Sequence, residues 1–237
     1  MTGTLINALA IAAGGLIGTL FGARMPNRVR QTALDGLGLA TAAIGLKMTL
    51  DTKNILIVLG ALVLGGIIGE FLNLDLRVKR LGDAMERIVT GNNRSGAPTS
   101  GQGQFAQGFV TTSLLVCIGP MAIMGSIQDG LLGDYTTLTV KAVIDGFAAL
   151  AFGSSLGIGV SFAALPLAVY QGGLTLGASV FQSVLTEFIV AESTATGGVL
   201  VFAVGLSMLE IKQIRVANLL PAVFLAPLLS CLASLFR

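Results

Sequence analysis

The chain has 237 residues, of which 54% are hydrophobic and only 11% are charged. Soluble globular domains carry about 25% charged residues, so the composition excludes an ordinary soluble protein and indicates an integral membrane protein. Histidine is absent, and both cysteines, Cys117 and Cys231, lie in apolar segments. We therefore expect no metal site, no cofactor and no disulfide.

Three apolar segments predict the first membrane spans: 4–23, 32–50 and 54–74. Within the first of them, glycines recur every four residues at Gly14, Gly18 and Gly22. Small residues at this spacing let helix backbones approach closely in a membrane. The stripe predicts close packing against another helix, either within the subunit or across a homodimer.

Basic residues gather in two segments, 24–30 and 75–94. Both follow an odd number of spans, and cytoplasmic loops are rich in Lys and Arg, so we expect both inside and the N-terminus outside. Apolar residues at helical spacing predict an amphipathic helix over 75–89, followed by a cytoplasmic linker to residue 104. A nucleic-acid-binding patch is the alternative, but the segment is short and lacks aromatic residues, so we expect no nucleic acid partner.

The apolar segment 105–130 is long enough to cross a bilayer, but Gly119 and Pro120 interrupt it. Proline lacks an N–H and its ring clashes with the carbonyl one turn back, so the helix should kink or unwind here. In lipid, freed carbonyls are tolerated only where protein or a water-filled cavity satisfies them. The break therefore indicates either a solute path or a packing kink.

The second half predicts further spans at 137–153, 157–171, 173–190, 195–211 and 216–236, with one of the three short segments a candidate re-entrant loop. Lys212 and Arg215 would lie inside with eight spans and outside with nine. The predicted fold is an all-α polytopic transmembrane bundle of eight or nine spans with broken helices, in a single domain over 1–237.

An internal similarity favours eight spans. GLATAAIGLKMTL, beginning at Gly38, aligns without gaps on GVLVFAVGLSMLE, beginning at Gly198, and shares two glycines, an Ala, a Leu and a Met. Apolar sequence produces such matches by chance. An inverted repeat, as transporters commonly use, is the other interpretation.

Polar residues inside the spans are the candidate functional residues. Lys141 and Asp145 stand four apart on one helical face, where they can neutralise each other or share a proton and a bound ion. Charges at mid-membrane cost about 2.5–3.5 kcal/mol each, and a static ion pair is the alternative reason for this pairing. The candidate solute- or ion-binding residues are Lys141, Asp145, Gln171, Gly119, Pro120, Ser113, Asn218 and Asn7.

Five stretches carry a resemblance to a known family: FVTTSLLVCIGPMAIMGSIQDG, VKAVIDG, VYQGGLTL, RVANLLPA and the opening GTLINALAIAAGGLIG. With them the chain resembles, over essentially its whole length, the YqgA/YdfK-type family of bacterial inner-membrane proteins, domain of unknown function 554. The resemblance implies a location in the bacterial plasma membrane and, by label only, a transport role. It implies no substrate and no established binding residue.

A secondary transporter for a small solute or monovalent ion is the leading hypothesis, since broken helices and a titratable pair in the membrane are parts that transporters use. A channel or exporter pore would use the same polar path without a coupling carboxylate. A non-transporting membrane scaffold is the third hypothesis. An enzyme is disfavoured, because the sequence has no histidine, no recognisable nucleophile and base, and no phosphate-binding loop.

Overall fold

The computed structural model describes residues 1–80, 84 and 102–235, and these residues are helical apart from short connections. Among them, six helical units are long and apolar enough to cross a membrane alone. They are α1 (Thr2–Gly22), α2 (Asn27–Leu50), α7 (Thr136–Leu156), η1 with α8 (Ile158–Ala163 and Ala164–Leu176), α10 (Glu187–Met208) and η2 with α11 (Val216–Leu219 and Pro221–Leu235).

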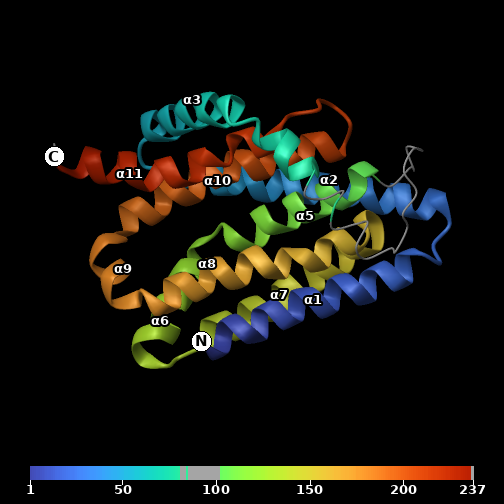
Figure 1. Cartoon of the computed structure of the whole chain (residues 1–237), viewed down its shortest axis with the longest axis horizontal. Helices are drawn as coiled ribbons and strands as arrows, with labels where there is room; N and C mark the ends of the chain where they lie inside the picture. The colour runs from blue at the N-terminus through green and yellow to red at the C-terminus, as the bar shows by residue number, and fades with distance from the viewer. Residues whose placement is uncertain (81–83, 85–101, 236–237) are drawn as a thin grey trace.

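If each of two bent helix pairs is counted as one span, the number of candidate spans is eight. The helix α3 (Ile55–Phe71) bends by 59° into the helical segment Leu74–Arg80, and α5 (Gln102–Cys117) bends by 62° into α6 (Pro120–Leu132). The short helix α9 (Ala178–Val184) lies between α8 and α10. The expected all-α bundle is confirmed (Figure 1), and α10 is the most buried of its candidate spans.

The two ends of the bundle differ in the residues that lie there. At one end, the Arg30 guanidinium donates to the carbonyl of Ser155 near the end of α7, and Arg215 pairs with Glu70 near the end of α3. We call this the basic end. The helix α1 begins at the opposite, N-terminal end, where α11 also terminates (Figure 1). A chain that begins and ends at the same end of the bundle crosses it an even number of times.

The predicted segment 173–190 is not a span. It comprises the last residues of α8, the short α9 and the beginning of α10, which starts at Glu187 rather than at 195. With eight spans, Lys212 and Arg215 lie on the side expected for that count, because Arg215 contacts Glu70 at the basic end. Part of this segment packs in a small core with α6, where Phe181 and Leu185 are partly buried, whereas Leu176 and Val180 are exposed.

The glycine stripe of α1 packs inside the subunit. A Cβ at Gly14, Gly18 or Gly22 would collide with the backbone of α7 at Gly146, Leu150 and Ser154 respectively. Because both sets of positions increase together, α1 and α7 run parallel, side by side. The predicted close packing is confirmed, and this face is covered within one chain.

The two segments of the internal similarity pack against each other in opposite directions. Gly38 of α2 lies against Met208 of α10. Its counterpart Gly198 lies against Met48, which is the counterpart of Met208. The neighbouring helices α3 and α11 also pack together, with Gly65 against the backbone of Ala222. Equivalent helices therefore face each other as an inverted repeat would place them.

The predicted amphipathic helix is described only in its first turns. Residues of the segment Leu74–Arg80 are helical and carry an ion pair between Lys79 and Asp75 at 2.7 Å. The rest of the predicted helix, to residue 89, and the linker as far as 101 lie outside the described residues except for residue 84.

Candidate functional site

The break in the fourth span is built by two adjacent residues. Gly119 has φ 155° and ψ 151°, a conformation that is essentially restricted to glycine. Pro120 is the first residue of α6, a position where the missing N–H costs nothing to the new helix. The sequence prediction of a broken span at this place is confirmed, with the 62° bend between α5 and α6.

Proline leaves one carbonyl of α5 without its helical donor. In an α-helix the carbonyl of Val116 would accept from the N–H of residue 120, but Pro120 has none. The Lys141 ammonium of α7 donates to that carbonyl oxygen instead, at 2.8 Å. The lysine thus satisfies a backbone acceptor that the break exposes, as a lipid environment requires.

Lys141 also forms an ion pair with Asp145 one turn further along α7. Both side chains are buried, at 8% and 10% exposure. The Asn7 side-chain amide of α1 donates to the same carboxylate oxygen, Oδ2, at 3.1 Å, and to Gln171 Oε1 of α8 at 3.4 Å. Four of the predicted residues therefore meet beside the predicted break.

Several polar atoms around this cluster have no hydrogen-bond partner among the described residues: Asn7 Oδ1, Gln171 Nε2, Ser113 Oγ and Thr112 Oγ1. The side chains of Asn7 and Gln171 are completely buried. Buried polar atoms in native proteins nearly always have a partner, which can be an ordered water or a ligand. The cluster offers both an acceptor and a donor to such a guest.

Asn218 lies away from this cluster. Its Oδ1 accepts from the N–H of Asp75 at 2.7 Å, and its Nδ2 donates to Glu70 at 2.6 Å. These bonds tie η2 to the end of α3 at the basic end of the bundle. The structure therefore places Asn218 among packing contacts, apart from Lys141 and Asp145.

A cavity of about 620 Å³ opens at the basic end. Its walls come from the segment Leu74–Arg80, α5, α10 and the η2 region, and its polar lining residues are Asp75, Lys79, Gln104, Gln107, Thr111, Ser207, Gln213 and Arg215. Thr111 and Val116 lie on the same helix α5, about 7.5 Å apart along its axis. The cavity thus reaches to within about two helical turns of the Lys141 contact.

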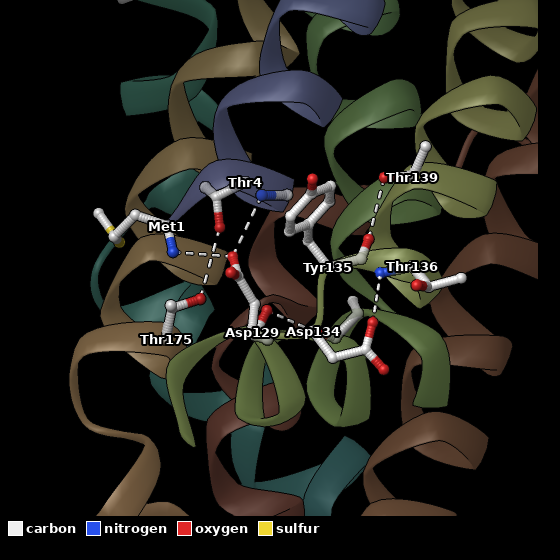
Figure 2. Close-up of polar contacts among 11 residues, drawn as sticks. Met1, Thr4, Asp129, Asp134, Tyr135, Thr136, Thr139 and Thr175 are labelled. Carbon is white, nitrogen blue, oxygen red and sulfur yellow. Dashed lines mark hydrogen bonds and ion pairs between the residues drawn. The ribbon is translucent and has the colours of Figure 1, made fainter. Parts of the chain in front are cut away.

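At the N-terminal end, polar contacts join α1, α6 and α8, as Figure 2 shows. The buried carboxylate of Asp129 accepts from the N–H of Gly3 at 3.2 Å and pairs with the amino group of Met1 at 2.9 Å. The hydroxyls of Thr4 and Thr175 lie 3.4 Å apart. Asp129 belongs to α6 and is buried.

The loop before α7 is ordered by its own acidic residue. The carboxylate of Asp134 accepts a hydrogen bond from the N–H of Thr136 at 3.0 Å (Figure 2). Hydrogen bonds from Thr136 hold the pKa of Asp134 below its usual value. This exposed carboxylate therefore supports the first turn of α7 and stands apart from the buried Asp129.

Sequence reasoning missed Glu192, which is completely buried in α10. Its Oε1 accepts from the backbone N–H groups of Lys53 and Asn54, at 2.7 and 2.9 Å, and its Oε2 accepts from the Thr52 hydroxyl at 2.7 Å. The carboxylate thus holds the α2–α3 turn and the beginning of α3. An acidic residue just before the predicted span at 195 was the available signal.

Six apolar helices of membrane-spanning length, two further bent helix pairs and a buried charge pair at a helix break define a polytopic α-helical membrane protein. The chain belongs to the family described as protein of unknown function DUF554, whose family model matches residues 2–231.

Two relatives match along nearly the whole chain. The uncharacterized membrane protein YdfK of Bacillus subtilis (strain 168) is 31% identical over 231 residues, which cover 96% of this chain and 94% of the relative. The uncharacterized protein YqgA of Escherichia coli (strain K12) is 33% identical over 228 residues, covering 96% and 95%. No solved structure gave a significant match.

Proposed function

We propose that this protein is a secondary transporter for a small solute or ion in the bacterial inner membrane, rather than an enzyme. The observation that carries the proposal is the position of Lys141, held between the carbonyl that Pro120 leaves free and the Asp145 carboxylate. Charged groups inside a membrane protein are costly and commonly mark solute or proton pathways. Discontinuous helices at mid-depth supply the binding sites of many transporters.

A second observation in support of this proposal is that the cavity lies at only one end of the charge pair. The cavity at the basic end approaches the charge pair along α5, whereas polar contacts of Asp129 and between Thr4 and Thr175 join the helices at the N-terminal end. A transporter exposes its central site to one side at a time, so an opening at one end fits a single state of the cycle. The antiparallel packing of α2 against α10 also agrees with an inverted repeat, which many transporters use.

The orientation follows from charge. Arg24, Arg28 and Arg30 lie in the turn between α1 and α2 and at the start of α2, and the basic residues of the segment Leu74–Arg80 lie at the same end. Cytoplasmic ends carry the excess of Lys and Arg, so the basic end faces the cytoplasm and the N-terminus faces outward. The cavity then opens to the cytoplasm.

The test is flux through the purified protein in liposomes. Solutes are first screened for thermal stabilisation of the detergent-solubilised protein, because a ligand that binds only the folded state raises its melting temperature. Stabilising solutes are then tested for uptake by the wild type and by the double variant Lys141→Met with Asp145→Leu. Loss of uptake by a folded double variant supports the proposal. Full uptake by that variant contradicts it and leaves a packed ion pair.

A further inference from the structure

The groups that meet the Asp145 carboxylate are hydrogen-bond donors. Its Oδ2 receives the Lys141 ammonium and the Asn7 side-chain amide. A metal cation needs several oxygen ligands, and here it would first have to displace both donors. A proton needs no such shell, since it binds to one oxygen. The chemistry around the carboxylate therefore favours a proton over Na⁺ as the ion that exchanges.

The other titratable groups on the neighbouring helices do not supply a further charge to the Lys141–Asp145 pair. On α5, Cys117 lies within electrostatic range of both Lys141 and Asp145, and on α8, Tyr170 lies near Cys117. The amino group of Met1 and the carboxylate of Asp129 in α6 form an ion pair with each other. Arg30 of α2 is bound to the Ser155 carbonyl at the basic end. Lys141 and Asp145 thus form the charged pair at the centre.

Protonation of Asp145 would leave the Lys141 ammonium without its counter-charge in a buried place. The ammonium then has the neutral Val116 carbonyl as its remaining contact. Its contact, the Val116 carbonyl, lies at the end of α5, one turn before Pro120. A buried ammonium without its counter-charge attracts an anion.

We propose, building on the transporter function proposed above, that the site binds a proton and a small monovalent anion together. The proton adds to the Asp145 carboxylate, which becomes a neutral carboxylic acid, and Lys141 keeps its own proton. The anion then pairs with the Lys141 ammonium, and Gln171 Nε2 provides an unused buried donor for it. The total charge of the site is zero before and after loading, which a low-dielectric interior favours.

Anion binding to the wild-type protein provides the first test, with acetate, formate and chloride as probes. Binding is followed by thermal shift in detergent, using sodium and choline salts in parallel. We expect stabilisation by a monovalent anion to increase as the pH falls and to be the same with both cations. We also expect a weakly buffered sample to take up about one proton per bound anion, because the two ligands load together. Binding without proton uptake, or stabilisation that needs Na⁺, would overturn the inference.

The variant Asp145→Asn mimics the protonated acid. At pH 8 it should bind the anion at least about tenfold more tightly than the wild type does, with little pH dependence. The double variant Lys141→Met with Asp145→Asn should bind none. Asp35→Asn removes an exposed carboxylate on α2 and should behave like the wild type. Weaker anion binding by a folded Asp145→Asn variant contradicts the inference, and if that variant does not fold, the proton-uptake measurement decides.

Flux measurements separate this inference from the proposed function. Uptake of a solute driven by Na⁺, without proton uptake, would support a transporter and overturn the proton and anion pairing. Proton-linked anion binding without any flux in liposomes would support the site and contradict the transporter.

Discussion

Lys141 donates its hydrogen bond to the carbonyl of Val116, the acceptor that the proline at position 120 leaves without its helical donor. The side chain of one helix thus replaces a backbone N–H of another. A carbonyl at the end of α5 also carries the partial negative charge of that helix terminus, which suits an ammonium. The charge pair and the helix break are therefore one structural unit.

The conformation of Gly119 should make the break sensitive to a methyl group. We expect Gly119→Ala to lower the free energy of unfolding by about 1–3 kcal/mol, because its φ of 155° is strained for any residue with a Cβ. Thermal unfolding in detergent measures the loss. Gly36→Ala is the matched control, since a Cβ at that helical position meets nothing within 4 Å and alanine favours a helix. Equal stability of both variants would contradict the assigned backbone conformation.

The charges of Lys141 and Asp145 should be strongly coupled in stability. Either Lys141→Met or Asp145→Leu alone leaves a buried charge without its partner and should cost about 3–5 kcal/mol. The double replacement should recover much of that loss. A double-mutant cycle of melting curves measures the coupling. Additive losses would show that the two side chains do not interact in the folded protein.

The contact between α1 and α7 should tolerate no added volume. Gly18→Ala would place a Cβ against the backbone carbonyl of Leu150, so the helices must separate. We expect a loss of about 1–3 kcal/mol, as for other overpacked positions. The melting temperature in detergent measures it, again with Gly36→Ala as the control. An unchanged melting temperature would place the stripe against lipid.

The carboxylate of Glu192 should stabilise the turn between α2 and α3. Glu192→Ala removes the charged acceptor of two backbone N–H groups and one hydroxyl, and hydrogen bonds to charged groups contribute about 1.5–3 kcal/mol each. We expect a loss of at least about 2 kcal/mol by thermal unfolding. Glu187→Ala, which removes an exposed carboxylate from the same helix, should change stability much less. Comparable losses in the two variants would argue against the capping role.

Eight spans with the basic end inside predict opposite accessibility for two loops. In a background without Cys117 and Cys231, a cysteine in place of Lys212 should resist an impermeant thiol reagent in intact spheroplasts. A cysteine in place of Asp134 should react, because that loop lies at the opposite end of the bundle. Labelling of position 212 alone would reverse the orientation, and equal labelling of both positions would contradict eight spans.

Features that depend on local chemistry could be predicted from the residues alone. A proline inside an apolar run lacks an N–H wherever it lies, so the break at Gly119 and Pro120 could be predicted. Residues four apart share a helical face, so the pairing of Lys141 with Asp145 and the α1 glycine stripe could be predicted as well.

Which helices contact each other could not be predicted from the residues and is known from the packing of the fold. Asn7 and Gln171 are separated by 164 positions, and Asn218 looked equally suitable but lies with Glu70 and Asp75 instead. The packing of the helices likewise showed that the segment 173–190 is not a span and that Glu192 is buried. The physical reason is that apolar composition specifies removal from water but not the partner, since lipid and neighbouring helices are equally apolar. Partners in a membrane are chosen by the fit of small residues and by buried hydrogen bonds, which form between positions distant in the chain.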